Sequence, residues 1–168
     1  MHPRVLLREL KQEDVPIIAE LANNIKIFNN VRDAFGHPYT EENAQRFFEH
    51  QAESDTEVVF AIETDGKLCG LCGLILQDDV YGKSAEVGYW LGEPFWGKGI
   101  ATSAIGLLVS HAFKEFKLIR LYAGVFEYNS GSMRVLEKVG FVKEGISRKA
   151  VFKNGKFWDE HRYAVLKI

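Results

Sequence analysis

The sequence has little of several features that mark particular classes of protein. Its 168 residues include two cysteines and four prolines, and the formal net charge is −2. Because basic residues are not in excess, we do not expect a nucleic-acid-binding protein. No apolar run has the length of a signal peptide or a membrane-spanning helix, so we expect a cytoplasmic protein without a membrane partner.

The composition is that of a soluble globular protein. With 46% hydrophobic and 26% charged residues, a chain of this length forms a core without disulfides or a structural metal. No repeat, low-complexity tract or linker-like stretch divides the sequence. We therefore expect residues 1–168 to form a single domain.

The two cysteines form a lone Cys69-x-x-Cys72 motif. A metal site would need a second pair of ligands nearby, and the five histidines are scattered, so no metal is expected. Residues 67–76 have the pattern of a buried strand, on which residues three apart point to opposite faces. We therefore expect two reduced thiols packed in a sheet.

Hydrophobic periodicity and turn residues predict an α+β protein. The expected strands are residues 5–10, 58–63, 67–76, 85–91, 118–126, 143–152 and 156–166. The expected helices are one that opens at Glu13 and Asp14 and buries Val15, Ile18, Ala19 and Ala22, one capped by Thr40, and the ranges 99–113 and 132–139. Hairpin turns are expected at residues 65–66 and 154–155. This order predicts a mixed, mostly antiparallel central sheet with helices on both faces, and it excludes a doubly wound βαβ array.

The glycines are slightly in excess, and several gather in one region. There a buried strand, residues 85–91, runs through a glycine-rich turn into a helix that opens at Gly99. Such a turn exposes backbone N–H groups beside a helix N-terminus, and together these groups can hold an anion. The simpler interpretation is a tight turn that needs glycine only for its backbone angles.

Two known phosphate-binding patterns match this turn only in part. The run from Gly92 to Lys98 resembles a P-loop, but Gly99 stands where a Ser or Thr should hold Mg²⁺. The run from Gly97 resembles the dinucleotide fingerprint, but Thr102 replaces its third glycine and no βαβ unit follows. Each match fails at a residue that carries the chemistry.

A third pattern fits better. Residues 96–101, Trp-Gly-Lys-Gly-Ile-Ala, resemble the pyrophosphate loop Gln/Arg-x-x-Gly-x-Gly/Ala of the GNAT N-acetyltransferase superfamily, with Trp96 in place of the first residue. Further matches follow in family order at residues 7–10, 38–40, 85–91, 129–132, 137–141 and 144–145. The resemblance covers nearly the whole chain, and it is strongest to the branch that contains the ribosomal-protein alanine N-acetyltransferases (RimJ/RimL type).

This resemblance implies acetyl-CoA as the co-substrate. It assigns the cofactor phosphates to Trp96, Gly97, Lys98, Gly99, Ile100, Ala101 and Thr102. It implies that the backbone of Tyr89, Trp90 and Leu91 pairs with the pantetheine arm like an added strand, and that one of these amides polarises the thioester carbonyl. Asn129 matches the family residue that contacts the arm, although a role as a helix N-cap is also open.

The resemblance also suggests which group protonates the leaving thiolate. Many members carry a tyrosine seven residues after this asparagine, but here the position is Leu136. In the similar branch a hydroxyl at the position of Ser132 lies beside the sulfur, so Ser132 is the expected acid, with a purely structural role in the helix as the alternative. Tyr128 is the nearest other hydroxyl.

The general base is less clearly marked. Glu86 alternates with the inward apolar residues of its strand and is the first candidate, with a solvated strand-edge charge as the alternative. Asp159, Glu160 and His161 are weaker candidates. Deprotonating an amine of pKa ~10.4 at pH 7 costs about 4.6 kcal/mol, whereas an α-amine near ~7.8 costs about 1 kcal/mol. An α-amino acceptor therefore needs less help from a base.

These observations predict an acetyl-CoA-dependent N-acetyltransferase that acts on a primary amine, either a peptide N-terminus or a small molecule. A polyamine or aminoglycoside acetyltransferase, which would need a cluster of carboxylates, and a non-catalytic acyl-CoA-binding module stay open as alternatives. The family builds its acceptor wall from residues 29–39 and the final hairpin. The candidate groups are Arg32, Asp33, His37 and Tyr39, with Phe28, Phe35, Phe95 and Trp158 as pocket or core aromatics. A homodimer is open, since the family is often dimeric.

Overall fold

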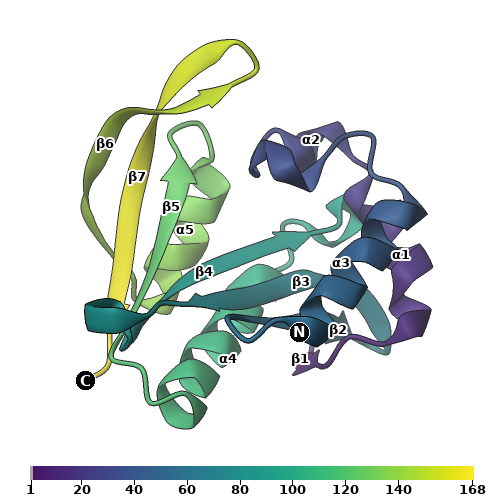
Figure 1. Cartoon of the computed structure of the whole chain (residues 1–168), viewed down its shortest axis with the longest axis horizontal. Coiled ribbons are helices and arrows are strands. Elements are labelled where there is room, and N and C mark those ends of the chain that lie inside the picture. Colours follow the sequence, from purple (N-terminus) through teal and green to yellow (C-terminus); the bar gives the residue numbers. More distant parts are fainter. Residues whose placement is uncertain (1) are drawn as a thin grey trace.

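The computed structural model describes residues 2–168 and contains a seven-stranded sheet in the order β1-β2-β3-β4-β5-β7-β6 (Figure 1). The strands are β1 (Val5–Arg8), β2 (Glu57–Thr64), β3 (Lys67–Leu76), β4 (Ser84–Leu91), β5 (Arg120–Phe126), β6 (Val142–Lys153) and β7 (Lys156–Leu166). Neighbouring strands are antiparallel except for the parallel pair β4 and β5. The predicted mixed, mostly antiparallel sheet is confirmed.

Helices cover both faces of this sheet, as predicted. They are α1 (Val15–Ala22), α2 (Ile25–Phe28), α3 (Glu41–Glu53), α4 (Ile100–Glu115) and α5 (Ser130–Val139). Helices α1 and α3 lie on one face, and α4 and α5 lie on the other (Figure 1). In residues 2–168 no helix combines the length and the apolar character needed to cross a membrane.

Local sequence signals explain where the helices begin and end. In α1 the four apolar residues at helical spacing are the ones that the sheet buries. The Thr40 side chain accepts a hydrogen bond from the Asn43 N–H and so caps α3. Gly140 ends α5 with φ of 111°, a left-handed conformation that favours glycine.

The structure adds one helix to the predicted elements and moves several of their boundaries. Strand β1, for example, ends at Arg8 rather than at residue 10. The one-turn helix α2 lies in a region where no element was predicted, and Asn24 caps it by accepting from the Lys26 N–H. Helix α5 begins at Ser130, two residues before the predicted start, because Asn129 is its N-cap. Strand β5 begins at Arg120 rather than at residue 118.

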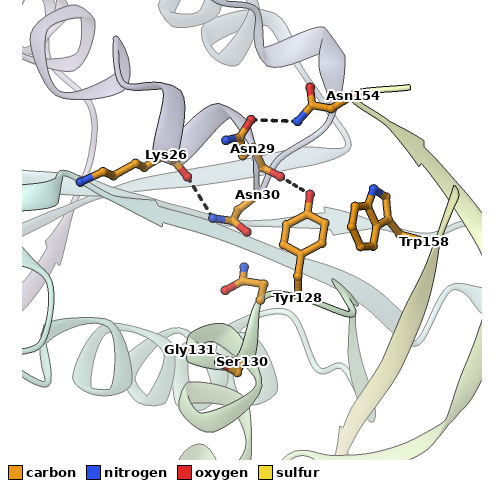
Figure 2. Close-up of a pocket in the computed structure, with 9 residues that line it drawn as sticks. Lys26, Asn29, Asn30, Tyr128, Ser130, Gly131, Asn154 and Trp158 are labelled. Atoms are coloured by element: carbon orange, nitrogen blue, oxygen red, sulfur yellow. Dashed lines mark hydrogen bonds between the residues drawn. The ribbon is translucent and has the colours of Figure 1, made fainter. Parts of the chain in front are cut away.

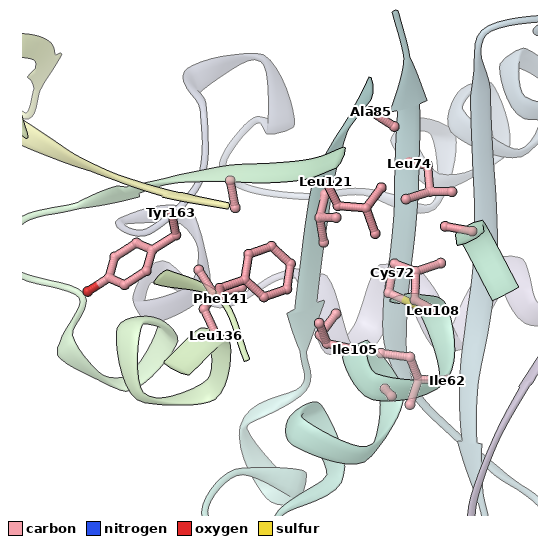
Figure 3. Close-up of a cluster of buried hydrophobic side chains, with 14 of the residues drawn as sticks. Ile62, Cys72, Leu74, Ala85, Ile105, Leu108, Leu121, Leu136, Phe141 and Tyr163 are labelled. Atoms are coloured by element: carbon pink, nitrogen blue, oxygen red, sulfur yellow. The ribbon is translucent and has the colours of Figure 1, made fainter. Parts of the chain in front are cut away.

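The main core lies between the sheet and helices α4 and α5 (Figure 3). Leu121 of β5, Leu108 of α4 and Leu136 of α5 are fully buried there. Cys69 and Cys72 both belong to this cluster and are buried and free, as predicted for reduced thiols. The prediction that they point to opposite faces of the sheet is wrong, because the pairing of β2 with β3 shifts by one residue at Cys69. A second cluster, between the other face and helices α1 and α3, fixes the opposite side of the sheet.

Candidate active site

The sheet opens between its two parallel strands. Residues Ser84–Glu86 of β4 pair with residues Arg120–Tyr122 of β5. Beyond these residues the two strands run in different directions (Figure 1). The space between them is a cleft of about 980 Å³, which continues toward the start of α4, the start of α5 and the segment after α2. Past Glu86, β4 therefore has a strand edge without a partner strand, which an extended ligand can use for hydrogen bonding.

The glycine-rich turn forms one end of this cleft. Gly97 and Gly99 have φ of 72° and 76°, and a Cβ at either position would meet no atom within 4 Å. Gly99 caps α4 without any side-chain hydrogen bond to the helix. The first N–H groups of α4 thus point to open space beside the positive end of the helix dipole, which is the geometry of an anion site.

Trp96 helps to shape this turn. Its indole Nε1–H donates to the Leu91 carbonyl at 2.8 Å, so the side chain ties the turn back to the end of β4. The cleft is lined by most of the residues predicted for cofactor binding: Tyr89, Trp90, Leu91, Trp96, Gly97, Gly99, Ile100, Ala101, Thr102 and Asn129. Lys98 is exposed and is the exception, since it does not line the cleft.

A pair of hydroxyl groups lies in the gap between β4 and α5. The Tyr89 hydroxyl and Ser132 Oγ are 2.6 Å apart. Burial raises the pKa of Tyr89 to about 12, while its hydrogen bond with Ser132 acts in the opposite direction. Tyr89 is therefore a neutral phenol near pH 7 that can exchange a proton with Ser132. Sequence reasoning had assigned only the backbone of Tyr89, and the role of its hydroxyl was missed.

Asn129 lines both the main cleft and a smaller neighbouring pocket, whereas Tyr128 lines only the smaller one. Asn129 Oδ1 accepts from the Ser132 N–H at 3.2 Å, which confirms the N-cap interpretation. Tyr128 lies in this smaller pocket of about 440 Å³, where its hydroxyl donates to the Asn29 carbonyl and Trp158 packs against its ring (Figure 2). The structure thus brings Ser132, but not Tyr128, to the main cleft.

Three carboxylates line the cleft. Glu57 of β2 accepts from Gln51 Nε2 at 2.7 Å and lies 3.6 Å from His50 Nε2. Glu86 accepts from Arg32 Nη2 at 2.9 Å, and about a quarter of its side chain is exposed. Glu160 of β7 accepts from Arg162 at 2.9 Å. The other two weaker base candidates, Asp159 and His161, do not line the cleft.

Only some of the residues expected to form the acceptor wall line the cleft. Arg32, Phe35 and Phe95 line the cleft, whereas Tyr39 is buried in the second core cluster and offers no polar group to a ligand. Asp33 instead pairs with Lys153 at 2.7 Å.

The remaining aromatic and polar candidates of this wall lie outside the main cleft. His37 stacks on the ring of Phe28, whose own ring lies below the Lys153 ammonium, and Trp158 lines the smaller pocket. Several residues of α2 and of the segment after it therefore contact other parts of the chain and do not face the main cleft.

Three lysine or arginine residues of the cleft were missed from the sequence, and one of them, Lys26 of α2, pairs with Glu93 at 2.8 Å. The other two are Arg134 and Lys138 of α5. They are four residues apart and so lie on one side of the helix. This spacing is the signal that sequence reasoning had available, but it does not show which way the helix faces.

A parted pair of parallel strands, a glycine turn at a helix start and a hydroxyl pair in the gap define a cleft for a long anionic co-substrate. Residues 4–142 match the family described as the acetyltransferase (GNAT) domain. The chain belongs to this family, and the resemblance found in the sequence is confirmed.

Individual relatives have the same character. The chain is 45% identical over 117 residues to a probable N-acetyltransferase, YjcK, and 40% identical over 103 residues to a putative ribosomal N-acetyltransferase, YdaF, both from Bacillus subtilis (strain 168). These matches cover 68% and 61% of this chain. They span less than two thirds of the relatives' own lengths, 64% and 56%.

A solved structure extends the likeness to the whole fold. The spermidine N-acetyltransferase from Vibrio cholerae, in complex with CoA and spermine, superposes with a TM-score of 0.84 at 27% identity. The superposition covers 96% of this chain and 95% of that protein.

Proposed function

We propose that this protein transfers the acetyl group of acetyl-CoA to a primary amine by direct attack of the amine on the thioester. The observation that carries this proposal is the Tyr89–Ser132 hydroxyl pair, which joins β4 to α5 and lines the same cleft as the glycine-rich turn. The CoA complex of the Vibrio cholerae relative, whose fold this chain shares, supports the choice of co-substrate.

The residues present fit acetyl-CoA. The open backbone around Gly97 and Gly99 and the first turn of α4 suit the pyrophosphate, with Trp96 holding the turn in shape. Arg134 and Lys138 add positive charge on the α5 side of the cleft. The free edge of Tyr89–Leu91, helped by Asn129, suits the amide groups of the pantetheine arm.

In this proposal the hydroxyl pair supplies the acid. Ser132 donates a proton to the departing sulfur, and Tyr89, kept neutral by burial, restores the serine proton. Tyr128 is the weaker candidate because its hydroxyl is already bonded to the Asn29 carbonyl outside the main cleft. A backbone N–H of β4 is the group proposed to polarise the thioester carbonyl.

Charge pairing favours an α-amine acceptor over a polyamine. Glu86 and Glu160 of the cleft each pair with an arginine, and Asp33 of the neighbouring segment pairs with Lys153. Glu57, which also lines the cleft, accepts from the neutral Gln51 side chain and lies 3.6 Å from His50, so it is a single carboxylate without a lysine or arginine partner in residues 2–168. A polyamine, with several ammonium groups, would need carboxylates that are not already neutralised. We therefore propose a peptide N-terminus or a small α-amine as the acceptor, in the cytosol, where free thiols such as Cys69 and Cys72 stay reduced.

The test is an acetyl-CoA consumption assay over α-amine peptides, amino-acid amides, spermidine and amino sugars. We expect CoA thiol to be released with α-amines and far less with spermidine. Acetyl-CoA binding without turnover on any amine would instead favour a binding module. Faster turnover of spermidine than of every α-amine would overturn the proposed acceptor class.

A further inference from the structure

The Glu160 carboxylate lies over β5 at Gly124, a residue that has no side chain to occupy this space. A Cβ at Gly124 would lie 2.5 Å from the Glu160 carboxyl carbon and 2.7 Å from one of its oxygens. The Glu160 carboxylate therefore lies directly over Gly124, where a larger residue would displace it. Arg162, two residues away on β7, holds the carboxylate in place at 2.9 Å.

Gly124 and Glu160 lie beside the part of the sheet where β4 and β5 are no longer paired. Glu86 and Tyr122 are the last paired residues of β4 and β5, and Gly88 and Gly124 each follow two residues later. Both glycines point away from the core under α4 and α5, because the flanking residues Val87 and Val125 are buried in that core. A Cβ at Gly88 would meet nothing within 4 Å, so the space opposite Glu160 is free.

The acid and this carboxylate consequently lie on opposite faces of the sheet. Tyr89 and Ser132 are on the side of α4 and α5, whereas Glu160 is on the other side, where α2 and the β6–β7 hairpin form the wall. An amine that attacks a thioester carbonyl approaches one face of it, and the sulfur must leave in a different direction. A base on one side and an acid on the other satisfy this requirement in a single gap.

We infer that Glu160 binds the ammonium group of the acceptor and takes up its proton, an inference that rests on the proposed acetyl transfer. The acceptor nitrogen gives one proton to Glu160 and forms the C–N bond, and the C–S bond breaks. The sulfur takes the proton of Ser132. The second proton lost by the nitrogen restores the proton that the Tyr89–Ser132 pair gave to the sulfur, so one proton in total passes from Glu160 to water.

Glu86 has a different position from Glu160. It lies at the closed end of the gap, at the last paired residue, and Arg32 covers it. The charged or titratable groups near Glu160 on this face include Arg162 on its own strand, Tyr122 on β5, the ion pair of Arg120 on β5 with Glu144 on β6, and Glu86 with Arg32. The Arg162 guanidinium also lies 6.0 Å from the centre of the Tyr122 ring.

The test compares Glu160→Gln and Gly124→Ala with Glu144→Gln. Glu144 on β6 is also paired with an arginine, Arg120, but does not line the cleft. The acceptor probe is an alanine-initiated tripeptide amide, with kcat/KM measured from pH 6 to pH 10. Acetyl-CoA affinity is measured separately by calorimetry for every variant.

We expect Glu160→Gln to lower kcat/KM at pH 7 by about 10²-fold, a usual contribution of a general base. The deficit should shrink as the pH passes ~7.8, where an α-amine loses its proton unaided. Gly124→Ala should show the same trend more weakly, because its methyl group displaces the carboxylate without removing it. Glu144→Gln should resemble the wild type, and acetyl-CoA affinity should not change.

Three outcomes separate the possibilities. Wild-type protein that acetylates no amine would overturn the proposed function itself. Active wild-type protein together with Glu160→Gln and Gly124→Ala variants that match Glu144→Gln would overturn only the role of Glu160. A loss of activity that is equal at all pH values would also overturn it, since a structural defect is not relieved by free amine.

Discussion

The Lys153 ammonium group lies 3.6 Å from the centre of the Phe28 ring, although 125 residues separate the two positions in the sequence. Lys153 ends β6 and is 2% exposed, and its Nζ also donates to the Val31 carbonyl at 2.9 Å and to Asp33 at 2.7 Å. One lysine thus fastens the tip of the final hairpin to the wall formed by α2 and the segment after it.

Replacing this lysine should loosen the acceptor wall. We expect Lys153→Met to lower the free energy of unfolding by on the order of 2 kcal/mol, because it removes a desolvated cation–π contact and two charge-assisted hydrogen bonds. The KM for the amine should rise more than the affinity for acetyl-CoA falls. Chemical denaturation and steady-state kinetics measure both effects. Lys156→Met, at an exposed position of the same hairpin, is the matched control and should change stability little.

The hydroxyl pair gives a prediction for the chemical step. Ser132→Ala should lower kcat by about 10²–10⁴-fold, the range for loss of a general acid, while the Kd for acetyl-CoA stays the same. Tyr89→Phe should have a smaller effect, since Ser132 can then exchange protons with water. Ser110→Ala, on the exposed side of α4, serves as the control. A Ser132→Ala variant with wild-type kcat would remove this residue from the mechanism.

The glycine turn can be tested against another glycine in the same helix. Gly99→Ala should destabilise the protein by about 1 kcal/mol, because φ is 76° there, and should weaken acetyl-CoA binding. Gly106→Ala lies inside α4 with open space around the new methyl group and should stabilise the protein by about 0.5–1 kcal/mol. Calorimetric titration and thermal unfolding distinguish the two. Equal acetyl-CoA affinity in both variants would contradict a role for the turn in binding.

Because the Cys72 thiol is buried, we expect the protein to lose stability at alkaline pH. Burial raises the pKa of Cys72 from 9.0 to about 12. The unfolded chain therefore releases this proton at lower pH than the folded protein, so its stabilising contribution is complete below pH 9 and is lost as the pH rises toward 12. Each such group lowers the free energy of unfolding by about 1.4 kcal/mol per pH unit in this range. Cys72→Ala should show a shallower decline in urea titrations between pH 9 and pH 11, and an unchanged slope would contradict the assignment.

Much of the fold was predictable because its signals are local. Thr40, Gly140 and the Asn154-Gly155 turn each fix the chain within a few residues of themselves, and the structure follows all three. Helix α2 was not predictable in this way. Its single turn is too short to show a periodic pattern of hydrophobic residues. In addition, the segment that follows α2 is held by Lys153, a residue near the other end of the sequence.

The site was predictable where it depends on backbone and not where it depends on side-chain packing. The glycine turn follows from residue types that permit positive φ. The Tyr89–Ser132 contact joins β4 to α5, and the place of Glu160 depends on Gly124 of another strand. Neither relationship has a signature in the sequence, since each requires knowledge of which strands are neighbours and where they separate.

The parting of β4 and β5 also gives the sheet two internal edges, in addition to the outer edges at β1 and β6. Unpaired strand edges recruit strands from other molecules and often start aggregation. Here α5 lies on one side of the opening, and the contact of Lys153 with Val31 and Asp33 joins the walls on the other. The molecule thereby keeps a hydrogen-bonding edge available to a slender ligand while shielding it from the polypeptide chains of its neighbours.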